Sequence, residues 1–194
     1  MKVALTGGIA CGKSRVASFL SAQDVDVCEA DELAHRALAA GTDVYAAVVD
    51  RFGKGILAKS GEIDRSVLAE RVFSSGKELA ALNALVHPAV EAAWNTWLEE
   101  RQGAMAVVVV PLLFEAGYGQ GWDAVICVCA SPATRKARLL ERGLTASQAD
   151  ARMRAQWPQR DKAARADYVL WNDGTVECLE AQVVRMLDSM KRGQ

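Results

Sequence analysis

A short segment near the amino terminus combines glycines, a lysine and a hydroxyl side chain at a spacing that suits phosphate binding. It reads Gly7-Gly8-Ile9-Ala10-Cys11-Gly12-Lys13-Ser14 and fits the pattern G-x-x-x-x-G-K-[ST]. In this pattern successive backbone N–H groups surround a phosphate, the lysine reaches its outer oxygens, and the last hydroxyl holds Mg²⁺. The apolar run 3–5 before the segment and the helical spacing of apolar residues after it predict a strand, a loop and a helix. We call residues 7–14 the phosphate loop and expect it to bind a nucleotide.

Asp31 is a candidate catalytic base. It follows the apolar run 25–28, and the carboxyl ends of strands line the ligand crevice of an open α/β sheet. A carboxylate there can accept the proton of an attacking hydroxyl group. The same position also suits the N-cap of a helix that begins at Glu32. Spacing alone leaves both interpretations open.

Basic residues are concentrated between positions 135 and 165, where nine lysines and arginines stand against three acidic residues. Arg138 and Arg142 lie four residues apart, which places them on one face of a predicted helix. Such a pair could neutralise the charge of a transferred phosphoryl group. The alternative is a solvated basic face.

The overall composition limits the classes of protein that fit. The chain has 194 residues and a formal net charge of −1, which argues against a general nucleic-acid or membrane-surface binder. Its five cysteines form no C-x-x-C pair, which favours a reducing compartment. Cys127 and Cys129 share one face of a predicted strand and suit the core, whereas positive charge near Cys11 could lower its pKa. No apolar stretch approaches the length of a membrane span.

Strands and helices alternate along the chain in a pattern typical of a parallel α/β sheet. The predicted strands are 2–6, 25–28, 106–110, 124–128 and 168–171. The long connection 29–105 predicts a small helical subdomain with helices over 31–40, 43–52, 65–73, 77–85 and 88–101. A second excursion, 131–167, predicts a mobile flap of two helices, the first starting at Pro132 and the second at a capping box formed by Thr145 and Gln148.

Further motifs narrow the class of nucleotide-binding protein. The chain has no N-K-x-D element, which guanine-binding proteins usually carry, and the third strand ends without the aspartate of a typical Walker B strand. Mg²⁺ would then be held mainly by Ser14, phosphate oxygens and water. These features favour a small-molecule kinase.

A series of short motifs follows the phosphate loop along nearly the whole chain. They are Leu5-Thr6-Gly7-Gly8-Ile9 with Gly12-Lys13-Ser14, Ala30-Asp31, Gly61-Glu62-Ile63-Asp64-Arg65, His87-Pro88, Val110-Pro111-Leu112-Leu113-Phe114-Glu115, Arg138-Leu139 with Arg142, Gln156, Lys162, Ala166-Asp167-Tyr168-Val169 and Asn172. Their order and spacing resemble the dephospho-CoA kinase family, which phosphorylates the 3′-hydroxyl of dephospho-CoA with ATP in the last step of CoA biosynthesis.

The resemblance implies an α/β fold, a three-layer P-loop kinase with a five-stranded parallel sheet, a helical substrate-binding insert and a helical lid. A single unit over 1–194 would comprise a nucleotide-binding core (1–31, 89–131 and 166–194), a helical substrate domain (32–88) and a lid (132–165). ATP and dephospho-CoA would be its small-molecule partners and Mg²⁺ its cofactor, with no nucleic acid or membrane partner. We expect a cytoplasmic enzyme that is a monomer or a small homo-oligomer.

The resemblance also implies the roles of individual residues. The catalytic residues would be Lys13, Asp31 and Arg142. ATP would be bound by Ala10, Cys11, Gly12, Lys13, Ser14, Arg15, Arg138 and Asn172, with Ser14 also on the metal. The CoA substrate would be bound by Thr6, Asp31, Arg65, His87 and Leu113.

Several positions depart from the family pattern. Ala10, Cys11 and Arg15 replace the usual third glycine, serine and threonine, and Glu29 stands where an aspartate is common. Ala10 would cost about 1 kcal/mol if its φ angle is positive. These departures leave Lys13 and Asp31 in place.

Alternatives remain open both for the class of protein and for the roles of single residues. A nucleoside or nucleotide kinase would share the loop, the lid and the acidic residue, and a nucleotide-dependent binding module would share the loop. His87 could be a half-buried histidine at a helix start, and Asn172 could simply shape a turn. Trp94, Trp97 and Trp157 could stack on adenine or pantetheine, although the spacing of Trp94 and Trp97 is typical of core residues.

Overall fold

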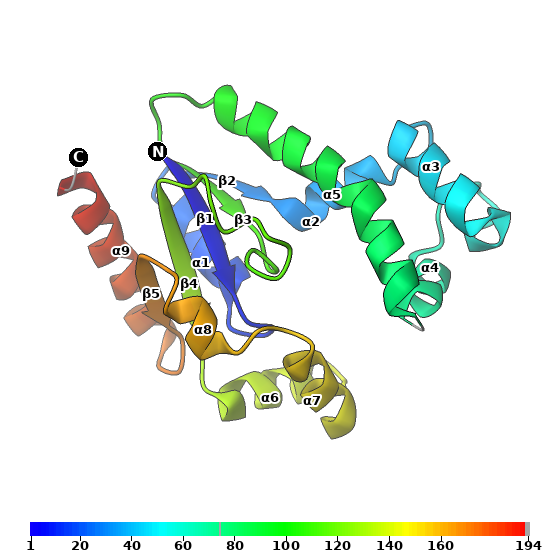
Figure 1. The fold of residues 1–194 in the computed structure, drawn as a ribbon. Coiled ribbons are helices and arrows are strands. Elements are labelled where there is room, and N and C mark those ends of the chain that lie inside the picture. Colours follow the sequence, from blue (N-terminus) through cyan, green and yellow to red (C-terminus); the bar gives the residue numbers. More distant parts are fainter. Residues whose placement is uncertain (74, 193–194) are drawn as a thin grey trace. The chain divides into compact units, whose positions relative to one another are not determined.

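The computed structural model describes residues 1–73 and 75–192 of the chain. Contacts divide the chain into two compact units, one formed by residues 1–28 and 101–194 and the other by residues 29–100. We call them the sheet unit and the helical unit and describe each by itself (Figure 1).

The five predicted strands are all present and form one sheet in the order β2-β3-β1-β4-β5. They are β1 (Lys2–Gly7), β2 (Asp26–Glu29), β3 (Ala106–Val109), β4 (Ala124–Cys129) and β5 (Tyr168–Trp171). β1 pairs in parallel with β3 and β4, and β4 pairs in parallel with β5. The expectation of a parallel α/β sheet is therefore confirmed.

β3 and β4 are buried along their whole length, and β1 is buried except at Lys2. β3 and β4 are continuous apolar runs, as expected for parallel strands packed on two sides. Helices α1 (Lys13–Ser21) and α9 (Val176–Arg192) supply one shared core, in which Leu20 and Val183 pack with Leu5 and Ile126 of the sheet. This packing fixes the carboxyl end of β1, from which the phosphate loop emerges.

The segment between β4 and β5 contains three helices among the described residues: α6 (Pro132–Glu141), α7 (Ala146–Arg154) and α8 (Gln159–Ala163). The capping box of Thr145 and Gln148 is present at the start of α7, as predicted. The prediction of only two helices was wrong, because α8 packs against β4 and β1 and buries Lys162 completely. The basic residues of this segment suggested a solvent-exposed surface, so an inward-facing helix was not predicted.

The helical unit contains α2 (Ala30–Ala37), α3 (Asp43–Phe52), the short helix η1 (Lys54–Ile56), α4 (Arg65–Phe73) and α5 (Gly76–Glu99). α5 packs against α2, α3 and α4 and is therefore the centre of this unit. The predicted break before Pro88 was wrong, because α5 runs through that residue. A proline removes one intrahelical hydrogen bond, and the packing of α5 on three neighbouring helices offsets that loss.

No helix within residues 1–73 and 75–192 is long and apolar enough to cross a membrane.

Candidate active site

The phosphate loop connects β1 directly to α1, as the sequence predicted. Gly12 is the N-cap residue of α1 and has a left-handed backbone with φ of 99°. The first amide groups of α1 therefore lie within the loop, where the positive end of the helix dipole favours an anion. The loop thus has the backbone arrangement of a phosphate site.

Ala10 also has a left-handed backbone, with φ of 60°. Because this φ angle is positive, alanine carries a conformational cost at position 10 that glycine would not. Left-handed residues interspersed with right-handed ones turn successive N–H groups towards a common centre, which makes an anion-binding concavity. Ala10 is buried and packs against Leu139 and Ala149, so its methyl group has a place in the fold.

Every carbonyl group from Gly7 to Gly12 accepts a hydrogen bond. Nζ of Lys13 donates to the carbonyl oxygens of Gly7 and Gly8, at 3.0 and 3.1 Å. The carbonyl oxygen of Gly12 accepts from backbone N–H groups of α1. Because the carbonyl groups are bound in this way, their negative ends do not compete with a phosphate for the centre of the loop.

Asn172 braces the loop from the end of β5. Its Nδ2 donates to the carbonyl oxygen of Cys11 at 2.8 Å, and its backbone N–H donates to the carbonyl oxygen of Cys129. A Cβ atom on Gly12 would lie 2.1 Å from Nδ2 of Asn172, so glycine is required there. Asn172 therefore supports the phosphate loop as well as its own turn.

The two predicted lid arginines have different surroundings. Nη1 of Arg138 donates to the carbonyl oxygen of Ala10 at 3.2 Å, and Nη2 donates to that of Asn172 at 2.9 Å. Arg138 therefore does not lie on a solvated basic face. Arg142 is the C-cap residue of α6 and is exposed, and its backbone N–H donates to the carbonyl oxygen of Arg138 at 3.3 Å, so it lies one helical turn after Arg138.

Buried polar groups surround the end of β3. Thr6, which is fully buried, donates to the carbonyl oxygen of Pro111 at 3.4 Å. Nζ of Lys162 donates to the same oxygen at 3.1 Å and lies 2.7 Å from Oε1 of Glu115. Oε1 of Glu115 also accepts from the backbone N–H of Trp157, while its Oε2 is buried and has no hydrogen-bond partner among the described residues. Leu113 is fully buried in the same turn, which is a packing position.

Two glutamines tie the segment around α8 to the phosphate loop. Oε1 of Gln156 accepts from the backbone N–H of Ile9 at 2.6 Å. Gln159 accepts from Sγ of Cys11 at 2.9 Å and also pairs with both backbone groups of Ala130. Neither glutamine was among the predicted site residues, although Gln156 belongs to the motif series.

The expected lowering of the pKa of Cys11 was wrong. Cys11 is fully buried, and its burial raises the pKa of the thiol despite the positive charges of Arg135 and Lys13. Cys127 and Cys129 lie side by side with their sulfur atoms 3.8 Å apart, both within the core, as predicted. These thiols are packing residues.

In the helical unit, Asp31 lies in the first turn of α2 and is exposed. The N-cap residue of α2 is Glu29, so the interpretation of Asp31 as a helix cap was wrong. His87 lies in the middle of α5, and burial lowers its pKa. Trp94 is buried on the same helix, which agrees with a core role.

A cavity of about 490 Å³ opens in the helical unit. His35, Leu38, Glu62, Ile63 and Arg65 line it, so it combines apolar surface with charged groups of both signs. Its volume is typical of small-molecule sites. Of the predicted substrate residues in the helical unit, Arg65 lines this cavity.

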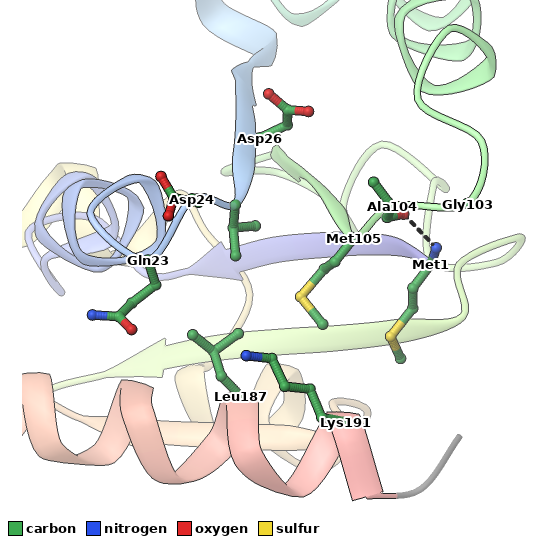
Figure 2. A pocket seen from close by; sticks show the side chains of 10 residues that line it. Met1, Gln23, Asp24, Asp26, Gly103, Ala104, Met105, Leu187 and Lys191 are labelled. Carbon is green, nitrogen blue, oxygen red and sulfur yellow. Dashed lines mark hydrogen bonds between the residues drawn. The ribbon is translucent and has the colours of Figure 1, made fainter.

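Figure 2 shows a second pocket, of about 340 Å³, at the opposite end of β1 from the phosphate loop. Met1, Met105 and Leu187 contribute apolar surface, and the N-terminal ammonium group of Met1 donates to the carbonyl oxygen of Ala104 at 2.7 Å. None of the predicted site residues lines this pocket. It is therefore separate from the candidate active site.

Comparison with known proteins identifies the family. A family model described as dephospho-CoA kinase matches residues 1–177. The chain belongs to the dephospho-CoA kinase family. A dephospho-CoA kinase from Thermosynechococcus vestitus is 41% identical over 100% of this chain and 96% of its own length.

Solved structures agree with this dephospho-CoA kinase assignment. A crystal structure of a Thermus thermophilus protein has a TM-score of 0.84 and 33% identity, covering 97% of both chains. The dephospho-CoA kinase from Campylobacter jejuni has a TM-score of 0.72 and 25% identity, covering 100% of this chain and 99% of its own. The α/β P-loop kinase fold is therefore confirmed, and the chain is a kinase that phosphorylates dephospho-CoA at the expense of ATP.

Mg²⁺ is the cofactor expected from the sequence, and the residues present can be examined for a fit to it. No group of three or more histidine, cysteine, aspartate or glutamate side chains in the described part of the chain could hold a metal ion by itself. Mg²⁺ usually takes few protein ligands and several oxygens from phosphate and water. The hydroxyl of Ser14, in the first turn of α1, fits that donor set.

Proposed function

We propose that this chain transfers the γ-phosphoryl group of ATP to the 3′-hydroxyl of dephospho-CoA and releases CoA and ADP in the cytoplasm, as a monomer or a small homo-oligomer. The observation that supports this most directly is the phosphate loop, in which every carbonyl group from Gly7 to Gly12 is bound. Such a loop presents backbone N–H groups to an anion. The family of the chain supports ATP as the nucleotide that this loop would bind.

The phosphate loop would bind and orient the triphosphate. The ammonium group of Lys13 now binds the carbonyl oxygens of Gly7 and Gly8, and a flexible lysine at this position can turn to the outer phosphate oxygens. Mg²⁺, held by Ser14, phosphate oxygens and water, would neutralise part of the phosphate charge. Arg142, exposed at the end of α6, would add positive charge to the transferred group.

Asp31 would act as the general base. Its carboxylate would take the proton of the 3′-hydroxyl while that oxygen forms a bond to the γ-phosphorus and the bond from the γ-phosphorus to ADP breaks. A ribose hydroxyl is a weak nucleophile, so its orientation and the removal of its proton are the main contributions that the protein can make. The exposed position of Asp31 leaves its carboxylate accessible to a substrate.

The cavity of the helical unit would bind part of dephospho-CoA. The guanidinium of Arg65 suits an anionic group such as the diphosphate, and Leu38 and Ile63 offer apolar contacts to the pantetheine arm. His87 would contribute to the same substrate from α5, whereas Thr6 and Leu113 are fully buried in the sheet unit and would act there as packing residues. These assignments make Arg65→Met a variant that should raise the KM for dephospho-CoA with little effect on ATP.

An ADP-release assay with ATP and Mg²⁺ tests the proposal. Dephospho-CoA, adenosine, AMP, CMP and pantetheine are offered separately, and dephospho-CoA is expected to stimulate ADP release well above the background rate. Stimulation by a nucleoside or a nucleotide instead would assign the chain to another kinase class. Tight ATP binding without stimulation by any acceptor would indicate a binding module.

A further inference from the structure

Arg135 is a buried arginine of α6 whose guanidinium group lies against the phosphate loop. Arg135 is 7% exposed, and its Nε donates to the carbonyl oxygen of Ile9 at 3.0 Å. A Cβ atom on Gly8 would lie 2.9 Å from Cζ of Arg135. The glycine at position 8 therefore leaves the space that this guanidinium group occupies.

Arg138 follows three residues later on α6 and donates to the next carbonyl of the loop, that of Ala10, at 3.2 Å. Residues three apart on a helix lie on the same face. The two arginines therefore bind two consecutive carbonyl groups, one on each side of Ala10 (Figure 1 shows α6 beside the loop that follows β1).

These two contacts fix the backbone of Ala10. The φ and ψ angles of a residue are set by the orientations of the two peptide planes that flank it. Arg135 holds the carbonyl of the Ile9–Ala10 peptide, and Arg138 holds the carbonyl of the Ala10–Cys11 peptide. Oε1 of Gln156 accepts from the N–H of Ile9, in the preceding Gly8–Ile9 peptide, at 2.6 Å. The relative orientation of the planes is therefore determined by side chains outside the loop.

The backbone of Ala10 needs such support. Its φ of 60° lies in the left-handed region, which is unfavourable for a residue with a Cβ atom. A residue in an unfavourable region persists only where the surrounding structure holds it there. Glycine would adopt the same angle without a steric penalty.

We propose that Arg135 is a positioning residue for ATP, which acts through the Nε hydrogen bond to Ile9 and keeps Ala10 in the left-handed conformation that turns the amides of the loop towards the triphosphate. This inference rests on the proposed function of the phosphate loop. It makes a specific prediction: the importance of Arg135 depends on which residue stands at position 10.

The test measures the Kd of a non-hydrolysable ATP analogue with Mg²⁺ by titration calorimetry. Arg135→Met is expected to raise the Kd about tenfold when residue 10 is alanine, which corresponds to about 1.4 kcal/mol. The same substitution in an Ala10→Gly background is expected to raise the Kd less than about threefold, because glycine needs no support at this angle. In steady-state assays the KM for ATP should rise while the KM for dephospho-CoA stays unchanged.

Two further variants separate the hydrogen bond from the charge. In Arg135→Gln the amide nitrogen stands as many bonds from Cα as Nε of arginine does, so this neutral side chain can donate to Ile9 and should keep most of the affinity. In Arg135→Lys a methylene group occupies that position, so the charge remains while the donor is lost, and the affinity should fall as in Arg135→Met. Arg152→Met, at an exposed position of α7, controls for the loss of one positive charge.

The outcomes that would overturn the inference are distinct. A lysine variant that binds like the wild type, together with a glutamine variant that binds like Arg135→Met, would show that Arg135 acts by charge. An equal effect of Arg135→Met in both backgrounds would remove Ala10 from the explanation. If Arg135→Met does not unfold cooperatively, the glutamine and lysine variants still decide the question. Failure of the wild type to bind the analogue would instead contradict the proposed function of the loop.

Discussion

Nζ of Lys162 lies 2.7 Å from Oε1 of Glu115, and no part of Lys162 is exposed to solvent. The pair joins α8 to the turn that follows β3, because Nζ also donates to the carbonyl oxygen of Pro111. Thr6 of β1 donates to that same oxygen. A buried ion pair and its hydrogen bonds thus connect segments that lie far apart in the sequence at the end of the sheet where the phosphate loop begins.

Removal of one partner of this pair should be strongly destabilising. Lys162→Met leaves a carboxylate in the interior without its cation, and Glu115→Gln leaves an ammonium group without its anion, so each should lower the free energy of unfolding by about 3–5 kcal/mol. The double variant leaves no uncompensated charge and should recover most of that loss. Urea denaturation of the four proteins measures these values. Single variants within about 1 kcal/mol of the wild type would show that solvent reaches the pair.

Asn172 offers a second test, because its amide donates to a carbonyl group of the phosphate loop. Asn172→Ala should lower the stability by about 1–3 kcal/mol, since the carbonyl of Cys11 loses its shortest hydrogen bond. Asn172→Asp should be worse, because it places a carboxylate oxygen opposite the carbonyl oxygen and adds negative charge near the triphosphate. Urea denaturation and binding of an ATP analogue both report this order. An aspartate variant that equals the alanine variant in both measurements would contradict it.

The five cysteines all lie in the described part of the chain, and we expect them to differ sharply in reactivity. Cys11, Cys28, Cys127 and Cys129 are buried and Cys178 is exposed. Burial raises the pKa of Cys11, so at pH 8 its thiol stays protonated and unreactive. A disulfide reagent should therefore modify Cys178 rapidly and the others only after unfolding. Cys178→Ser should abolish the rapid phase, and a rapid phase that survives in this variant would show that the core admits the reagent.

Much of the fold could be predicted from the sequence because local patterns determine it. The apolar runs of the sheet and the capping box of Thr145 and Gln148 are signals that residues carry by themselves. The continuity of α5 through Pro88 could not be predicted. It depends on the packing of α5 against α2, α3 and α4, and tertiary packing of this kind overrides a local preference.

The site could be predicted only in part for the same reason. Gly12 and Lys13 belong to a contiguous motif, so their spacing indicates their chemistry. Arg135 and Lys162 lie in a basic segment, where their charge suggests a solvated surface, yet both are buried. Their roles come from partners more than forty positions away, Ile9 and Glu115, and no sequence spacing marks such contacts. The order of the family motifs was the one signal that included Lys162.

The stability of the protein should depend on pH through His87. Burial lowers the pKa of His87 in the folded state, so the unfolded state binds the proton more tightly. Stability should therefore be full above the unfolded pKa, near 6.5, and should decrease as the pH falls below that value. Unfolding measured between pH 7.5 and 5.5 should show a smaller decrease for His87→Gln than for the wild type. His35→Gln is the comparison variant, and an identical slope for the wild type and His87→Gln would exclude the effect.

Asp31→Asn separates catalysis from binding most directly. The substitution keeps the size and polarity of the side chain but removes its ability to accept a proton, so kcat should fall at least about a hundredfold. The Kd of an ATP analogue should change little, because Asp31 lies in α2 and the phosphate loop is assembled from other segments. Glu32→Gln, a change at the neighbouring exposed carboxylate of the same helix turn, should leave kcat near the wild-type value. Lys13→Ala should instead lose both ATP binding and turnover. Wild-type turnover in Asp31→Asn would show that the acceptor hydroxyl reacts without this base, and orientation of the two substrates would then have to account for the rate.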